Sequence, residues 1–212
     1  MKKYVILISG RGSNMQALLN ARLPGQCAAV ISNRPDASGL EEACAKGVPA
    51  LVVDHKMYPD RDAFDQALMA QIDHYEPDLV VLAGFMRILT PAFVARYSGR
   101  LLNIHPSLLP AFPGLDTHGA ALRAGVRIHG ATVHFVTPEL DVGPIIIQAA
   151  VPVLSGDTPE VLAERVLVQE HLIYPQAVRW FLEGRVRLEG GRVWLDEGLH
   201  AAATAAMLVP AI

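Results

Sequence analysis

Three polar residues have the types and spacing that acyl chemistry needs. Asn103 and His105 end a short apolar run that leads into the proline-bounded turn 106–110, and Asp141 lies in a later loop just before Gly143. Attack of an amine on a carbonyl creates an oxyanion, which an amide N–H and a protonated imidazole can stabilise. A carboxylate can accept the proton that the amine loses and steady the imidazolium. We predict that Asn103, His105 and Asp141 form a catalytic centre that requires no metal.

A structural role is the alternative for each of these residues taken alone, because a histidine at a strand end or an aspartate in a turn commonly only makes local hydrogen bonds. His129 and His134 lie five positions apart on an expected strand, so their side chains point to opposite faces and do not make a zinc-binding pair. We expect structural roles for the other histidines and no metal site. These histidines are His55, His74, His118, His171 and His200.

A glycine-containing turn, Ser9 to Asn14, follows the first apolar run and precedes a helical segment. Its backbone N–H groups lie at a helix N-terminus, where a phosphate can bind. The glycine spacing does not match a dinucleotide fingerprint, the second strand ends in Ser32-Asn33 without the expected carboxylate, and no Walker lysine follows. A tight turn that needs glycine only for its backbone angles is the alternative.

Apolar runs alternate with helical segments in the first half of the chain. Continuous apolar strands that alternate with helices predict an α/β fold, with a doubly wound, mostly parallel sheet and helices on both faces, the Rossmann-like arrangement. Ligands then bind at the carboxyl ends of the strands. The expected strands are 4–8, 27–32, 50–53, 79–83 and 101–105, and the expected helices are 15–21, 37–46, 61–75 and 91–97.

The second half of the chain predicts a hairpin-like pair of strands, 129–136 and 144–153, with Asp141 in the loop between them. Thr158 and Pro159 are suited to begin a long helix that continues past Pro175 to about Phe181. A small hairpin is expected at 186–195. We therefore expect residues 1–195 to form a single domain and 196–212 to be a C-terminal tail whose Ala-rich part makes it a candidate for fraying.

Composition excludes several classes of protein. The 212 residues carry a net charge of −3 with scattered basic residues, so no nucleic-acid surface is expected. No stretch approaches the roughly 18 apolar residues of a membrane span, and the apolar run after Met1 is too short for a typical secretory signal, so we expect no export. Two cysteines are too few for a disulfide framework. We predict a cytoplasmic protein with small-molecule partners, no nucleic acid and no membrane association.

The motif around these residues resembles the folate-dependent formyltransferases. It runs Asn103-Ile-His105-Pro106-Ser107-Leu-Leu-Pro110 and is followed by Gly114, by the strand from His129 to His134, and by Asp141 with Gly143-Pro144. The resemblance extends from Ser9 to about Leu195, nearly the whole chain. It implies a formyltransferase fold in which Asn103, His105 and Asp141 match the catalytic trio of the family.

The resemblance also implies the substrates. The chain length favours the family members that transfer the formyl group of 10-formyltetrahydrofolate to the amine of glycinamide ribonucleotide in purine synthesis, as a monomer or homodimer. The implied phosphoribosyl-binding residues are Gly12, Ser13, Asn14, Arg61, Pro106, Ser107 and Glu170. The implied folate-binding residues are Met86, Arg87, Ile88, Leu89, Val136, Glu139, Leu140 and Asp141. Because apolar side chains also build cores, Met86, Ile88 and Leu89 have a structural alternative.

Two departures from the family pattern affect these expectations. Arg11 stands where relatives often have a smaller polar residue, and Val142 replaces a common glycine beside Asp141. Deformylases of the family usually carry an additional N-terminal domain, and the transformylases that act on initiator tRNA add a C-terminal domain. With a first strand from about Tyr4 and few residues after Leu195, we expect neither. A nucleotide-binding protein that has lost catalysis is the alternative outside enzymes.

Overall fold

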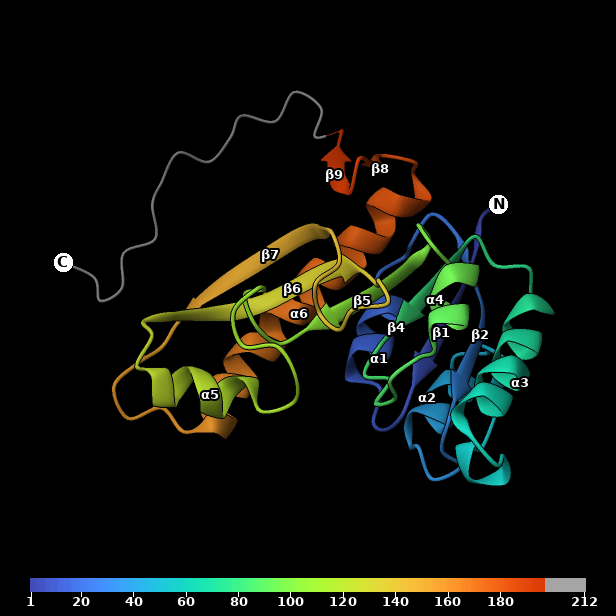
Figure 1. The fold of residues 1–212 in the computed structure, drawn as a ribbon, viewed down its shortest axis with the longest axis horizontal. Helices are drawn as coiled ribbons and strands as arrows, with labels where there is room; N and C mark the ends of the chain where they lie inside the picture. Colours follow the sequence, from blue (N-terminus) through green and yellow to red (C-terminus); the bar gives the residue numbers. More distant parts are fainter. Residues whose placement is uncertain (197–212) are drawn as a thin grey trace.

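The computed structural model describes residues 1–196, and these residues form a seven-stranded sheet and a separate two-stranded hairpin (Figure 1). The order in the sheet is β3-β2-β1-β4-β5-β6-β7. The first five strands in this order are parallel, whereas β6 is antiparallel to both neighbours. The strands are β1 Lys3–Ile8, β2 Gln26–Ser32, β3 Ala50–Val52, β4 Leu79–Leu82, β5 Leu101–His105, β6 Ile128–Phe135, β7 Ile145–Pro152, β8 Val186–Glu189 and β9 Arg192–Leu195.

Several helices begin at a residue whose side chain caps them. The side chain of Asp60 accepts a hydrogen bond from the Ala63 N–H at the start of α3, and Thr158 accepts one from Val161 before the long α6. Pro159 occupies the first turn of α6, and the helix continues through Pro175. The helices are α1 Ser13–Asn20, α2 Gly39–Ala45, the 3₁₀ helix η1 His55–Met57, α3 Arg61–Asp73, α4 Pro91–Arg96, α5 Thr117–Ala124 and α6 Pro159–Leu182.

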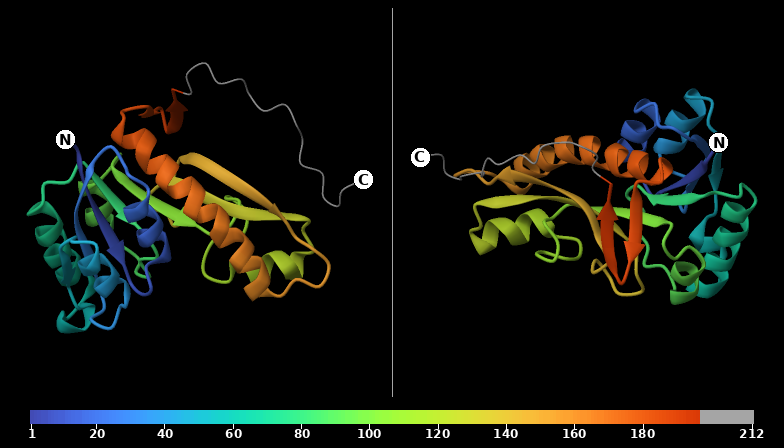
Figure 2. Two further views of the ribbon diagram at one scale, coloured as in Figure 1. Left: turned by 180° about the vertical axis from the view of Figure 1, so that it is seen from behind. Right: turned by 90° about the horizontal axis from the view of Figure 1, so that it is seen from above.

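The sheet separates two apolar clusters. One contains side chains of α1 and α6 with alternate residues of β1, β4, β5 and β6, and α6 crosses the back of the sheet beside α1 (Figure 2). The other contains side chains of α3 and α4 with the opposite residues of β1, β2 and β4. Along β5, Leu102 and Ile104 face α6, so Asn103 and His105 face the other side. Asn103 and His105 therefore lie on the sheet face opposite α6.

The predicted fold class is confirmed, including the doubly wound parallel part and the 145–152 hairpin partner of β6. Observed element ends differ from the predicted ones by one or two residues in most cases. Two elements were not predicted, α5 and η1. The predicted tail 196–212 lies outside the described residues except for Asp196. In the described part of the chain, none of the helices combines the length and the apolarity that crossing a bilayer requires.

Candidate active site

His105 and Asp141 meet although 36 positions separate them in the chain. The His105 Nδ1 and Asp141 Oδ1 atoms are 3.6 Å apart, and both side chains are nearly buried. Asp141 has a left-handed backbone, with φ of 57°, and its Oδ2 accepts a hydrogen bond of 3.0 Å from the Gly114 N–H. The His105 Nε2 lies 3.0 Å from the Phe112 carbonyl oxygen. Both ring nitrogens thus face oxygen atoms, Nε2 at hydrogen-bond distance and Nδ1 at ion-pair distance.

Asn103 lies on the same sheet face as His105, two residues earlier on β5. Directly opposite on β6 lies His134, whose Nε2 is 3.2 Å from the Asn103 amide nitrogen. His134 Nδ1 is 2.9 Å from the Phe135 carbonyl oxygen. The sequence reasoning gave His134 no chemical role, because the contact depends on the β5–β6 register, which neither strand reveals alone.

The turn after His105 is held by polar contacts to β6 and β7. Thr132 Oγ1 donates to the Ser107 carbonyl at 2.7 Å and accepts from the Leu109 N–H at 3.0 Å. Gln148 Nε2 donates to Thr132 Oγ1 and to the Leu109 carbonyl. Ser107 is fully buried, and its hydroxyl donates to the Ala111 carbonyl at 2.6 Å. The Ser107 hydroxyl is therefore engaged within the turn, and Pro106 beside it is half-buried.

The glycine turn connects to the long helix through one buried contact. Gly12, with φ of 70°, precedes α1, whose first residues are Ser13 and Asn14. Asn14 Nδ2 donates to Glu170 Oε2 on α6 at 2.6 Å, while Asn14 Oδ1 is buried and has no partner within the described structure. Burial raises the pKa of Glu170, and the Asn14 hydrogen bond and the nearby His105 act in the opposite direction. One line of polar groups thus runs from the turn to His105.

A cavity of about 400 Å³ opens between the glycine turn and the ends of β2 and β4. Among its described lining residues, Arg11, Arg34, Arg87 and His55 are basic or can become so, and none is acidic. The cavity therefore suits an anion. Arg61 is exposed and does not line it. The other lining residues are Ser9, Gly10, Gly12, Ser13, Asn14, Asn33, Ala83, Gly84 and Met86; the catalytic trio is not among them.

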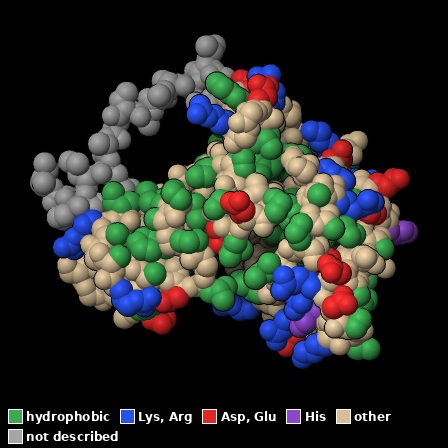
Figure 3. Space-filling view, in the orientation of Figure 1, with side chains coloured by type: hydrophobic (Ala, Val, Ile, Leu, Met, Phe, Trp, Pro, Cys, Tyr) green, Lys and Arg blue, Asp and Glu red, His purple; other side chains and the backbone are tan. Residues whose placement is uncertain are grey.

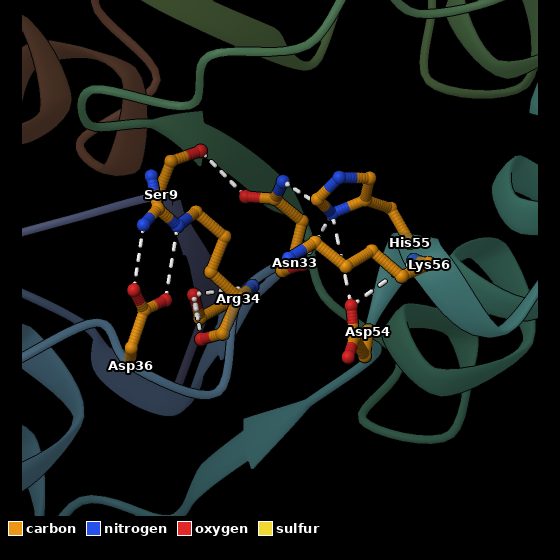
Figure 4. A network of polar contacts seen from close by, with 8 residues as sticks. Ser9, Asn33, Arg34, Asp36, Asp54, His55 and Lys56 are labelled. Carbon is orange, nitrogen blue, oxygen red and sulfur yellow. Dashed lines mark hydrogen bonds and ion pairs between the residues drawn. The ribbon is translucent and has the colours of Figure 1, made fainter.

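A hydrogen-bond network ties the glycine turn to the neighbouring strand ends (Figure 4). The Ser9 hydroxyl donates to Asn33 Oδ1 at 2.5 Å and accepts from the Met86 N–H at 2.8 Å. Asn33 holds His55, whose Nδ1 lies 2.8 Å from the Asn33 carbonyl oxygen. Ser9 therefore fixes Met86, in the segment after β4, relative to the turn.

Two segments, one after β4 and one around Asp141, expose large apolar side chains. Met86 and Ile88 follow β4, and Leu140 and Val142 flank Asp141; these four side chains are 58–70% exposed. Leu89 and Val136 are partly buried and pack against the same apolar cluster. Glu139 is exposed. Figure 3 shows apolar side chains around the hollow at the centre of this side of the molecule. Exposed apolar groups gathered on two loops are typical of a ligand-binding site.

Arg87 lies in the same segment but points to the glycine turn. Its guanidinium stacks on the Phe64 ring, 5.2 Å from the ring centre, and its Nε is buried without a hydrogen-bond partner in the described residues. Arg87 thus lines the basic cavity together with the glycine turn.

Comparison with known proteins is consistent with this geometry. The family profile described as formyl transferase matches residues 2–178. The phosphoribosylglycinamide formyltransferase of Escherichia coli strain K12 is 52% identical over 91% of this chain and 92% of its own length. The crystal structure of glycinamide ribonucleotide transformylase 1 from Symbiobacterium toebii has a TM-score of 0.90 and 53% identity, covering 92% of this chain and 94% of that one.

A formyltetrahydrofolate deformylase from Pseudomonas syringae pv. tomato is a more distant structural relative. Its TM-score is 0.85 at 31% identity, and the match covers 92% of this chain but 65% of the deformylase. The transformylases match over nearly their whole length, whereas the deformylase has a substantial part without a counterpart here. From the matched residues and these relatives, the chain belongs to the formyl transferase family.

Proposed function

We propose that this enzyme transfers the formyl group of 10-formyltetrahydrofolate to the amine of glycinamide ribonucleotide, a step of purine synthesis. The observation that carries the proposal is the buried Asn14–Glu170 hydrogen bond, which joins an anion-binding turn to the neighbourhood of His105. A substrate with a phosphate at one end and an amine at the other could bind the turn with its phosphate and present its amine near His105. The similarity to phosphoribosylglycinamide formyltransferases supports the same substrate.

The chemistry we assign to the trio is addition and elimination at the formyl carbon. The substrate amine attacks that carbon, and the developing oxyanion receives hydrogen bonds from the Asn103 amide and the His105 imidazolium. Asp141, 3.6 Å from His105, holds the imidazolium charge and accepts the amine proton directly or through water. When the C–N10 bond of the folate breaks, a proton reaches N10, so the products are the formamide and tetrahydrofolate.

The phosphate of the substrate is assigned to Gly12, Ser13 and Asn14. The N-terminus of α1 offers free N–H groups to an anion, and the surrounding cavity carries only basic and neutral side chains. Glu170 is assigned to a ribose hydroxyl, with the unpartnered Asn14 Oδ1 as a further acceptor. Arg61, at the exposed start of α3, is assigned a supporting charge for the phosphate, as the resemblance implies.

The folate donor is assigned to the two loops that carry Met86, Ile88, Leu140 and Val142. A pterin ring needs apolar walls, and the exposed apolar side chains of these loops are suited to supply them. Arg87 is available to a carboxylate of the donor because its Nε lacks a partner within the described residues.

The test is incubation of the purified enzyme with 10-formyltetrahydrofolate, with and without glycinamide ribonucleotide. Mass spectrometry of both products separates transfer from hydrolysis. We expect formylglycinamide ribonucleotide and tetrahydrofolate in equal amounts only when the amine is present. Equal release of tetrahydrofolate and free formate without the amine would instead identify a deformylase. Replacement of His105 by Ala supplies the inactive control.

A further inference from the structure

We propose that His134 is a positioning residue that fixes the orientation of the Asn103 amide for formyl transfer. The two residues are opposed on β5 and β6, with the Asn103 amide nitrogen 3.2 Å from His134 Nε2. The inference rests on the function proposed above, because it assigns the amide a part in that reaction.

The protonation of the ring follows from its partners. His134 Nδ1 lies 2.9 Å from the Phe135 carbonyl oxygen, which can only accept a hydrogen bond, so Nδ1 carries the proton. In a neutral ring, Nε2 then presents a lone pair. Only the nitrogen end of the Asn103 amide can bond to that lone pair, since the reversed amide would bring its oxygen against it. The ring therefore selects one of two amide orientations that are nearly equal in shape.

The surroundings keep the ring neutral and fixed. His134 is 2% exposed, and burial lowers its pKa. The β6–β7 register shifts next to His134, which pairs with Ile145 after Val133 pairs with Ile147. Such an irregularity re-aims a side chain beside a site. The charged groups that act on the ring are Asp141 from the loop after β6 and His105 from β5. Strand β7, 145–152, contributes no titratable side chain.

Gly143 closes the remaining side of the ring. A Cβ at this position would meet the Phe135 carbonyl oxygen at 1.7 Å and His134 Nδ1 at 3.3 Å. The backbone of Gly143 thus packs directly against the Phe135 carbonyl, which accepts the hydrogen bond from His134 Nδ1. The loop that carries Asp141 is in this way built onto the same histidine that orients Asn103.

The contact with His134 affects the reaction through one hydrogen-bond donor, the second N–H of the Asn103 amide. One Asn103 N–H is used by His134, and the second N–H is held in a fixed direction for the oxyanion. Without the His134 lone pair, the amide could reverse and present an oxygen, which repels an oxyanion. Loss of His134 should therefore lower kcat and leave the KM of both substrates nearly unchanged, because the oxyanion exists only along the reaction path.

The test is a double-mutant cycle with Asn103→Ala and His134→Phe, measured as kcat in the transfer assay. We expect roughly a 10-fold loss for His134→Phe, the effect of one hydrogen bond, and roughly 10² to 10³ for Asn103→Ala. The double variant should be no worse than Asn103→Ala alone, since His134 acts only through that amide. His134→Gln, which can still accept from Asn103, should recover most of the loss. The proposal would be overturned if the kcat losses of the two single variants multiplied in the double variant, or if His134→Gln did not recover kcat.

A matched cycle controls for general damage. His129 is the other buried histidine of β6, and its ring contacts His118 and Phe112 instead of Asn103. Any effect of His129→Phe should multiply with that of Asn103→Ala. Equal coupling in both cycles would show a non-specific disturbance and overturn the specific role of His134. A wild-type enzyme that transfers no formyl group would refute the proposed function instead.

A measurement on the unmodified protein covers the case in which the variants do not fold. Long-range ¹H–¹⁵N NMR correlations report which nitrogen of a histidine carries the proton. We expect the His134 signal, assigned by its loss in His134→Gln or by backbone connectivity, to show a neutral ring with the proton on Nδ1 at pH 7.5. A proton on Nε2 would be incompatible with the orientation of Asn103 and would overturn the proposal without any activity assay.

Discussion

Replacement of Asp141 by Asn tests the proposed roles of His105 and Asp141 with little change to the structure. Asn has nearly the same shape and tolerates the left-handed backbone at this position, where φ is 57°. Its side-chain oxygen can still accept the hydrogen bond from the Gly114 N–H, which leaves the amide nitrogen facing His105. The substitution therefore removes the charge beside the imidazole while the loop is kept.

The expected loss follows from the distance between the two groups. Unit charges 3.6 Å apart interact by about 4–5 kcal/mol at an effective dielectric constant of ~20, and both side chains are nearly buried, so water screens them weakly. At about 1.4 kcal/mol per factor of ten, removing this stabilisation from the imidazolium-containing transition state lowers kcat roughly 10³-fold. The loss of a proton acceptor acts in the same direction.

The assay is kcat at saturating substrates, together with thermal unfolding followed by circular dichroism. Asp157→Asn is the matched control, because Asp157 is a nearly buried carboxylate that pairs with Arg165 away from the trio. We expect this control to lower stability and to keep kcat within about threefold of the wild type. An Asp141→Asn enzyme whose kcat stays within tenfold of the wild type would refute the role given to the pair.

Three further predictions concern the loop, the acid stability and the donor site. Gly143→Ala should lower the melting temperature or prevent folding, because its Cβ would lie 1.7 Å from the Phe135 carbonyl oxygen; an unchanged melting temperature would contradict the packing. Burial, with the nearby His118, lowers the pKa of His129 to about 4 from 6.5, so the unfolded chain binds that proton more readily. The free energy of unfolding should therefore fall by at most about 3 kcal/mol as pH drops from 6.5 towards 4, and urea titrations should show a smaller fall in His129→Gln. Met86→Asp should raise the KM for the folate donor several-fold and leave kcat unchanged; an unchanged KM would remove Met86 from the donor site.

Much of the fold was predictable because its signals are local. The apolar run 79–83 and its neighbours can only be buried strands, and Thr158-Pro159 marks the start of α6 within the sequence itself. The helix α5 gave no such signal, since its eight residues include His118 and Gly119 and bury few side chains. Its position depends on packing against α6, which no local pattern encodes.

The site was predictable to the extent that its residues sit at strand ends. Asn103 and His105 share a face by their spacing of two, whereas the approach of Asp141 depends on a left-handed residue in a loop. The pairing of Asn103 with His134 depends on long-range register, so the sequence could not supply it. Arg61 shows the same limit, because a position at a helix start does not determine whether the side chain reaches the cavity.

The strand period of two explains how one sheet serves both as core and as site. On β5 and β6, Leu102, Ile104, Ala131 and Val133 face α6, and the intervening positions place polar side chains on the other face. The sheet face opposite α6 is covered by α3 and α4 where it is formed by β2 and β4. Where it is formed by β5 and β6, the same face carries polar residues, and loops cover them. A slip of β6 by one residue would move the polar side chains against α6 and the apolar ones into the site. The apolar core under α6 therefore fixes the β5–β6 register on which the site depends. Substitutions in that core are expected to lower activity by shifting these strands, even though the substituted residues do not contact the substrate.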